Sequence, residues 1–286
     1  MPAAGRTGRH MHHPLFESVV LPLLLSLAGI GLIRRFAGLR RASAGVGLAV
    51  LLATVWMIGW TDRPAGVMQK LPWILAGAWL LGTTLDAVAA NRLLQWLALS
   101  CGWSAACWWL GSRGVLLGIC FAATGAWVLG CLLRPPEHRA EAAAAVVLAS
   151  LGLAAVCFVA GSLALLQLGV LLSAAMTGMA LWLWPKPQVH FGASGVAVAG
   201  IGWLALAQAA VLLVPARLSA LALLALSFAA APLLVHLWPA NRPRSGLLAV
   251  ALIAGAMAAG ALALQGAGGG NGAAVEQRGD DEYYRK

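Results

Sequence analysis

Residues 142–184 have the sequence AAAAVVLASLGLAAVCFVAGSLALLQLGVLLSAAMTGMALWLW, an apolar run without a charged residue. A helix needs roughly 20 such residues to cross the hydrocarbon core of a bilayer, so the run is long enough for two crossings. Gly161 and Ser162 divide it near its middle, and both residue types favour turns. The run therefore predicts a membrane hairpin of two helices, 142–160 and 163–184.

The composition of the whole chain also favours a membrane protein. Of the 286 residues, 61% are hydrophobic and 10% are charged, against roughly 45–50% and 25% in soluble domains. Too few polar side chains remain to cover a water-soluble globule of this size. Within lipid, a helix satisfies its own backbone hydrogen bonds. The predicted fold class is therefore an all-α, polytopic integral membrane protein with the lipid bilayer as its partner.

The chain contains further apolar runs of similar length, separated by short polar loops. The ten predicted spans are 14–33, 44–60, 71–90, 93–111, 114–133, 142–160, 163–184, 193–214, 218–238 and 246–265. Similar loops recur after every second span, which predicts about ten transmembrane helices arranged as serial helical hairpins. Eight or nine spans stay possible, because the cut in the longest run depends on one turn. We expect a single transmembrane domain at 14–265, between a flexible tail at 1–13 and a flexible, glycine-rich and charged tail at 266–286.

Basic residues are unequally divided between two sets of loops. The loops 34–43, 90–95, 134–141, 185–192 and 239–246 contain ten Lys and Arg, and the other internal loops contain four. Because an excess of Lys and Arg marks the cytoplasmic side, we expect this first, proline-rich set in the cytoplasm and both termini outside. The predicted location is the bacterial inner membrane. No small-x-small site follows the first run, which predicts an uncleaved first helix, with Met11 as an alternative first residue.

Asp86 is the acidic residue that the sequence places inside a predicted span beyond its first turn. It stands in GTTLDAVAANRLLQW (82–96), four residues before the predicted helix end at Ala90. About 6 Å of helical rise therefore separates it from the interface. Two interpretations stay open: an interfacial carboxylate with a basic or water partner, and an inward-facing site for a proton or a substrate. Thr83, one turn earlier on the same face, is able to support either role.

Other polar residues in apolar helices complete the list of candidates. Gln167 and Gln208 are amides that can bond across helices or contact a polar substrate, so they join Asp86 and Thr83 in a candidate polar intramembrane site. His236 is a candidate cofactor residue, because a lone membrane histidine can ligate haem or a chlorophyll-type pigment, although it more commonly bonds to a neighbouring helix or faces headgroups. Small residues on helix faces allow close packing within the chain or contact with other membrane subunits. These are Gly114, Gly118, Gly169 and Ser173.

Several functions are not expected from this sequence. The net charge of +10 comes from short loops, without interleaved aromatic residues on one face, so nucleic acid is not an expected partner. No cofactor and no metal site is predicted, because the cysteines form no CxxC pair. They are Cys101, Cys107, Cys120, Cys131 and Cys157. The predicted spans contain no clustered acids, and the sequence has no HExxH motif and no nucleophile with an evident base nearby, so we do not expect an enzyme.

Three functional hypotheses follow from the sequence. The first is a small-molecule permease with a weakly polar path at the midplane of the membrane. The second is a non-catalytic subunit or assembly factor of a larger membrane complex, since the chain offers many packing surfaces and no clear site. The third is a pigment-associated or haem-associated membrane protein, which depends on His236.

Overall fold

The computed structural model describes residues 16–39, 41–134, 140–184, 188–230, 232–233 and 243–266, with side chains in the last range described from Ala249 onward. Within these ranges the regular structure is helical throughout, and no strand is present. The predicted all-α fold class is confirmed. Residues 1–13, almost the whole 266–286 tail and His236 lie outside the described residues.

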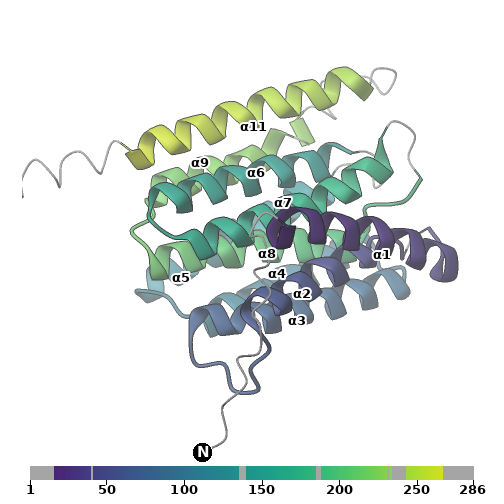
Figure 1. The fold of residues 1–286 in the computed structure, drawn as a ribbon, viewed down its shortest axis with the longest axis horizontal. Helices are drawn as coiled ribbons and strands as arrows, with labels where there is room; N and C mark the ends of the chain where they lie inside the picture. Colours follow the sequence, from purple (N-terminus) through teal and green to yellow (C-terminus); the bar gives the residue numbers. More distant parts are fainter. Residues whose placement is uncertain are drawn as a thin grey trace, which may run out of the picture.

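The helices follow one another with short connections. They are η1, a π-helical turn (Phe16–Val20), α1 (Leu21–Ala37), α2 (Ala44–Ile58), α3 (Val67–Ala87), α4 (Arg92–Leu110), α5 (Val115–Leu133), α6 (Glu141–Val159), α7 (Leu163–Leu183), α8 (Ala193–Leu213), α9 (Leu218–Leu226), the short 3₁₀ helix η2 (Ser227–Ala229) and α11 (Pro243–Gly266). Figure 1 shows most of them lying side by side, with α11 along one side of the bundle over α6 and α9.

The turn predicted in the uncharged run is confirmed. Helix α6 ends at Val159 and α7 begins at Leu163. Gly161 has a φ of +87°, a left-handed conformation that glycine adopts without a steric penalty. The hydroxyl of Ser162 then accepts a 3.3 Å hydrogen bond from the backbone N–H of Leu165 and caps α7.

In the part of the chain that the structure describes, six helical segments are long and apolar enough to cross a membrane. They are Phe16–Ala37, Val115–Leu133, Glu141–Val159, Leu163–Leu183, Ala193–Leu213 and Ala249–Gly266. The predicted count of about ten spans is not confirmed. Helix α2 has 15 residues, which give it a length of about 22 Å against the roughly 30 Å of a hydrocarbon core. Helix α9 has nine residues before it changes to the 3₁₀ geometry of η2.

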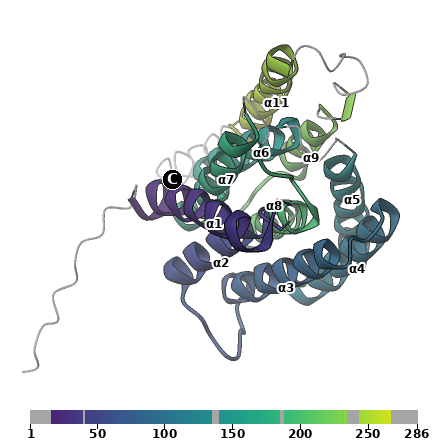
Figure 2. The same ribbon diagram turned by 90° about the vertical axis from the view of Figure 1, so that its right-hand side faces the viewer.

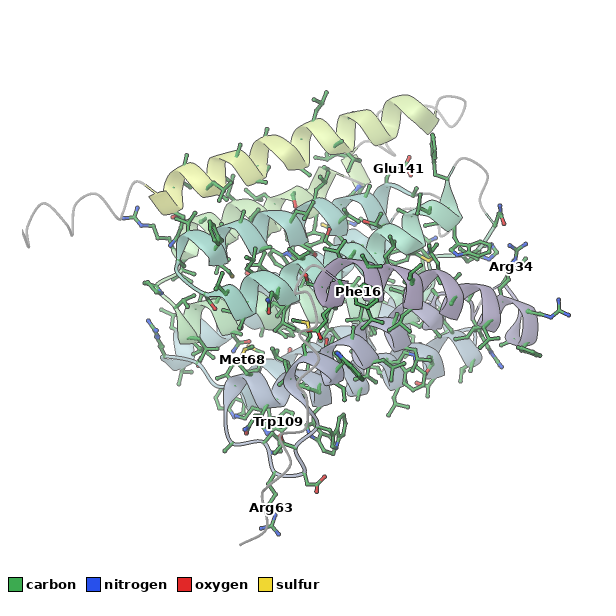
Figure 3. The ribbon with its side chains drawn as sticks, in the orientation of Figure 1. Phe16, Arg34, Arg63, Met68, Trp109 and Glu141 are labelled. Atoms are coloured by element: carbon green, nitrogen blue, oxygen red, sulfur yellow. The ribbon has the colours of Figure 1, made fainter. Side chains whose placement is uncertain are left out.

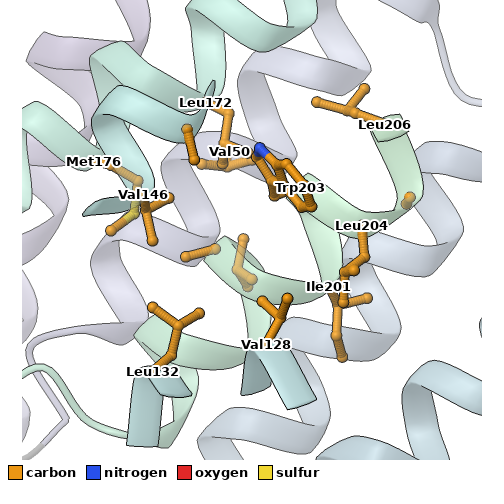
Figure 4. Close-up of a cluster of buried hydrophobic side chains, with 14 of the residues drawn as sticks. Val50, Val128, Leu132, Val146, Leu172, Met176, Ile201, Trp203, Leu204 and Leu206 are labelled. Atoms are coloured by element: carbon orange, nitrogen blue, oxygen red, sulfur yellow. The ribbon is translucent and has the colours of Figure 1, made fainter. Parts of the chain in front are cut away.

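Helix α8 forms the centre of the molecule. Every residue from Ala193 to Val211 is buried, and the helix contacts α2, α3, α4, α5, α6 and α7. Figure 2 shows α8 surrounded by its neighbours. Its sequence is rich in Gly, Ala and Val, and small side chains on every face allow neighbouring helices to approach closely from all directions. Figure 4 shows apolar side chains around it, including Val50, Leu132, Val146 and Leu172.

The helices alternate in direction, so their ends gather in two layers. In one layer Asp86, near the end of α3, bonds to the start of α8, and Ser43, before α2, bonds to Ser194. We call this layer the Asp86 end. In the other layer Gln208, near the end of α8, bonds to the end of α4, and Arg113, before α5, bonds to the last turn of α8. We call this layer the Gln208 end.

The outer surface of the helices is strongly apolar, and charged side chains lie near the two ends. Figure 3 shows Arg34 near the Asp86 end and Arg63 in the connection between α2 and α3. The Arg34 guanidinium lies 5.4 Å from the Trp182 ring, and the Lys70 ammonium lies 5.7 Å from the Trp109 ring. Aromatic rings beside cations are typical of membrane interfaces. Large exposed apolar side chains include Leu24, Leu32, Leu116, Ile119, Leu163 and Leu252.

Candidate functional site

Asp86 holds the start of helix α8 from the neighbouring helix α3. Its Oδ1 accepts a 2.8 Å hydrogen bond from the backbone N–H of Ala193, and its Oδ2 accepts a 2.9 Å bond from that of Ser194. The first N–H groups of a helix have no partner within the helix and form the positive end of its dipole. The residue at the N-cap position of α8, Gly192, has no side chain to cap it. The carboxylate of α3 therefore takes the place of a local cap.

Two glycines allow the carboxylate to reach this position. A Cβ atom at Gly192 would lie 2.7 Å from Asp86 Oδ1, and a Cβ at Gly82 would lie 2.9 Å from the backbone oxygen of Ala193. Both distances are shorter than side-chain atoms tolerate. Gly82 and Asp86 are four residues apart and share a face of α3. The contact between α3 and α8 thus depends on backbone touching backbone, with Asp86 at its edge.

Further hydrogen bonds join helix α2 to the same contact. The hydroxyls of Ser43 and Ser194 are 2.8 Å apart and share a hydrogen bond. The indole N–H of Trp79 donates a 3.0 Å bond to the backbone oxygen of Ala44. The half-buried Thr83 hydroxyl donates to Leu80, within its own helix, at 2.9 Å. The Asp86 end is therefore a polar joint between α2, α3 and α8.

Gln208 forms a similar joint at the opposite end of α8. Its side chain is 1% exposed, and its Nε2 donates to the backbone oxygens of Cys107 at 3.0 Å and Gly111 at 2.7 Å. These oxygens belong to the last turn of α4, where carbonyl groups lack helical partners. Gln208 Oε1 has no hydrogen-bond partner among the described residues. The amide therefore bonds across helices, one of the two roles expected for it.

The four candidate polar residues do not meet in one place. Fourteen residues of α8 separate Ser194, which bonds to Asp86, from Gln208, a rise of about 21 Å. Thr83 lies with Asp86, whereas the half-buried Gln167 lies near the start of α7 and so towards the Gln208 end. Their participation in a substrate site stays a prediction. His236, the candidate cofactor residue, lies outside the described residues.

The small residues of α7 pack against α6, whereas those near the start of α5 lie beside the preceding connection. Gly169 lies against Ala154 of α6, where an added Cβ would come within 2.9 Å of the Ala154 Cβ. Ser173 donates a 3.2 Å bond to the backbone oxygen of Val147, also in α6. Gly118 lies next to Ser112, and Gly114 is exposed before α5. Binding of other subunits through these faces stays a prediction. Within the described ranges, no three His, Cys, Asp or Glu side chains gather to hold a metal ion.

A cavity that the sequence did not predict lies between α5, α8 and α9. Its volume is about 230 Å³, and its wall consists of Leu117, Cys120, Phe121, Thr124, Trp203, Leu204, Ala207, Leu218, Leu221, Ala222 and Ala225. An apolar cavity of about 150 Å³ already binds benzene in another protein. The volume is therefore sufficient for a small organic molecule or part of a hydrocarbon chain.

The cavity opens on the outer surface between α5 and α9. Cys120 on α5 and Leu218 and Ala222 on α9 are exposed, whereas the opposite wall, formed by α8, is buried. The wall residues with polar side-chain groups are Thr124, Cys120 and Trp203, whose buried indole N–H has no hydrogen-bond partner among the described residues. The indole of Trp203 packs edge to face against Phe228 of η2, with ring centroids 5.0 Å apart. The cavity is thus mostly apolar, and its open side lies on the outer surface of the bundle.

The cavity runs from the Gln208 end to the middle of the bundle. Thr124 is the central residue of α5 and Trp203 is the central residue of α8. Leu117 and Leu218 belong to the first turns of α5 and α9, and both helices begin at the Gln208 end. From Leu117 to Thr124 the helical rise is about 10 Å. A second cavity, of about 20 Å³, is lined by residues of α2, α3, α7 and α8 and holds nothing larger than a water-sized molecule.

The sequence contains no signal from which this cavity could have been identified. Leu117, Phe121 and Thr124 share one face of α5, but the same residue types occur where a membrane helix faces lipid or a neighbouring helix. Across the described ranges, the fold and the site define an all-helical arrangement with six segments fit to cross a membrane and an apolar cavity that opens laterally. No protein-family model matches the chain, and a search of the curated proteins finds no match.

Proposed function

We propose that the protein is a small-molecule permease of the bacterial inner membrane and that it binds its substrate in the cavity between α5, α8 and α9. The observation that carries the proposal is the depth of this cavity, which reaches Thr124 and Trp203 at the centres of their helices. Transporters bind substrates near the membrane midplane, because access can then alternate between the two sides. The weakly polar wall favours a substrate that is mostly apolar.

The broken helix beside the cavity also supports this function. Helix α9 ends at Leu226 and continues as the 3₁₀ segment η2, from which Phe228 packs against Trp203. Discontinuous helices commonly border transporter sites, since they can change direction at the break. Helix α8 is held at both ends by Asp86 and Gln208. A rigid α8 and a broken α9 would allow one wall of the cavity to move against the other.

The proposed orientation places the Asp86 end in the cytoplasm. The described part of this end contains Arg34, Arg35, Arg41, Arg92 and Arg134 near helix termini, and basic residues mark the cytoplasmic side. A reporter that is active only in the cytoplasm, fused within the connection between α2 and α3, should stay inactive. The same reporter fused after Lys286 should also stay inactive. Strong activity at either position would reverse or overturn the proposed topology.

Purification of the full chain in a mild detergent tests the permease proposal. We expect the isolated protein to gain thermal stability when 1-decanol, a neutral apolar chain, is added. Ala222→Leu places a larger side chain at the open side of the cavity and should abolish this gain. Ala251→Leu makes the same substitution at an exposed position of α11 and should leave it unchanged.

Two further measurements separate transport from the alternatives. Cells producing the protein should differ from cells producing Ala222→Leu in their tolerance of 1-decanol, which disturbs membranes. A protein that purifies with a stoichiometric partner, and is not stabilised by 1-decanol, would instead support a non-catalytic subunit or assembly factor. Binding without any difference in tolerance would contradict transport of this alcohol and restrict the cavity to a binding role.

A further inference from the structure

We propose that the molecule bound in this cavity is an anionic amphiphile, with its hydrocarbon chain in the cavity and its acidic headgroup at two arginines, Arg113 and Arg217. This inference rests on the proposed function, because it assigns the substrate class of the same cavity.

The two arginines stand at the same end of the two helices that border the cavity. Arg113 precedes α5 by two residues, and Leu117, four residues further along, is part of the cavity wall. Arg217 is the N-cap residue of α9, and the next residue, Leu218, is also part of the wall. Both arginines are exposed. Both arginines therefore stand beside wall residues in the sequence, at the Gln208 end of the cavity, and the apolar walls continue further inside.

Backbone contacts hold both guanidinium groups in place. Arg113 Nη2 donates a 3.3 Å bond to the backbone oxygen of Leu212, at the end of α8. Arg217 Nη1 donates a 3.1 Å bond to the backbone oxygen of Leu264, at the end of α11. A guanidinium has five N–H donors, so each group retains donors beyond the one used here. Carboxylate and phosphate oxygens are the groups that such donors bind most strongly.

The described helices and connections around the cavity mouth contain no acidic side chain. Helices α5, α8, α9 and α11, together with the connections at 111–114 and 214–217, contain no Asp or Glu. Helices α5 and α9 also begin here, so the positive ends of two helix dipoles point to the same region. Neither helix has a side-chain cap hydrogen bond at its N-cap residue, Gly114 or Arg217. The electrostatic environment at this mouth thus favours a negative charge.

The walls of the cavity define the other part of the ligand. They are formed mostly by Leu, Phe, Ala and Trp side chains over a rise of about 10 Å along α5. These side chains present carbon atoms and no charged group, so the wall favours a hydrocarbon chain over a charged one. Because the open side lies between α5 and α9, a chain can enter laterally from the bilayer. A membrane-dissolved amphiphile with an acidic headgroup satisfies both requirements.

Decanoate and 1-decanol provide a matched pair of probes for the full-length protein in detergent. They have chains of equal length, but decanoate carries a negative charge and 1-decanol does not. We expect decanoate to bind about tenfold more tightly, because charge-assisted hydrogen bonds to the arginines add to the same chain contact. Arg113→Gln and Arg217→Gln should each remove most of this preference and leave 1-decanol binding unchanged.

Three controls keep the result interpretable. Arg63→Gln removes an exposed arginine in the connection between α2 and α3, which is no part of the cavity wall, and should not alter either affinity. Arg113→Lys and Arg217→Lys retain the charge and should retain part of the preference, which separates loss of charge from loss of the backbone contact. Decyl phosphate, with a dianionic headgroup, should bind at least as tightly as decanoate if phosphate lipids are the source of the ligand.

The outcomes distinguish this inference from the function on which it rests. Equal binding of decanoate and 1-decanol, both blocked by Ala222→Leu and both unaffected by the arginine variants, would overturn the anionic headgroup and leave the apolar cavity in place. Binding of neither probe would overturn the cavity assignment and this inference together. A preference for decanoate that Arg63→Gln removes as strongly as Arg217→Gln would show nonspecific attraction to a basic surface and would also overturn it.

Discussion

The Asp86 end and the Gln208 end of the bundle both join helices through polar side chains, but the residues and their surroundings differ. At the Asp86 end, the carboxylate and two serines bond to one another or to backbone groups, and glycines bring the helices into direct contact. At the Gln208 end, one amide closes α8 against α4, while two exposed arginines flank an open cavity. In the first arrangement the Asp86 carboxylate is bonded to the start of α8. The second arrangement leaves an open cavity with two exposed positive charges near its end.

The difference shows that an ionisable residue in a predicted span can join two helices. Asp86 is the residue that the sequence singles out, and the structure gives it a bonding role at a helix terminus. The cavity lies among residues that look like ordinary membrane-helix residues. Substitutions at the Asp86 end should therefore mainly lower the free energy of unfolding, whereas substitutions of the arginines at the Gln208 end should mainly change ligand affinity.

The largest effect is expected where helix backbones touch at the Asp86 end. Gly82→Val would place side-chain atoms against the backbone of Ser194 and Ala193, and such overpacking costs about 3 kcal/mol. Gly77→Val on the same helix has open space around it and should cost much less. Unfolding in mixed detergent and SDS micelles measures both. Equal losses for the two variants would show that the α3–α8 contact is looser than described.

Removal of the Asp86 carboxylate should cause the next largest loss of stability. Asp86→Ala leaves the N–H groups of Ala193 and Ser194 without their acceptors, at a cost of about 2 kcal/mol. Asp86→Asn retains one acceptor oxygen and should lose less. Asp62→Ala, in an exposed connection, serves as the control. If the Asp86→Ala protein were stable but no longer altered cellular tolerance of 1-decanol, Asp86 would have a role in transport.

A smaller loss of stability is expected when the Gln208 amide at the opposite end is removed. Gln208→Leu removes two hydrogen bonds to the last turn of α4, but it also removes the buried Oε1 atom, which has no partner among the described residues. The two effects oppose each other, so we expect a net loss of about 1 kcal/mol. Gln167→Leu, at a half-buried position, should change the stability by less. A larger loss for Gln167 would identify it as the more important polar contact.

The smallest effect on stability is expected from the arginines beside the cavity. Arg113→Gln and Arg217→Gln alter exposed side chains, and such changes remain within about 0.5 kcal/mol. Their effect should be visible in ligand affinity instead. The same unfolding assay, run without ligand, checks this separation. Destabilisation comparable to that of Asp86→Ala would make these arginines structural residues, like those of the opposite end.

Much of the helical pattern was predictable from the sequence, because a bilayer imposes a length and an apolar composition on each crossing segment. The turn at Gly161 follows from the length of the uncharged run and from the residue types at its middle. The count of about ten spans was less predictable. Helix α2 is shorter than its apolar run suggests, and α9 changes to 3₁₀ geometry at Ser227, where no proline or charge marks the change.

The partner of Asp86 could not be predicted in the same way. Ala193 lies 107 positions away in the chain, and any helix start at the same depth would have been an equal candidate. Arg92, the next basic residue along the chain, bonds to the backbone oxygen of Arg134. Such pairings depend on which helices become neighbours, and that is decided by side-chain fit over whole helices.

The sequence by itself determined that this chain is helical and apolar enough for a membrane, because composition and run length follow directly from the residues. Only the tertiary structure decided that α8 is central, that Asp86 caps it, and that a cavity remains between α5, α8 and α9. These features arise from the way the surfaces of several helices fit together. A leucine on a helix has the same apolar character whether it meets lipid, another helix or an empty space.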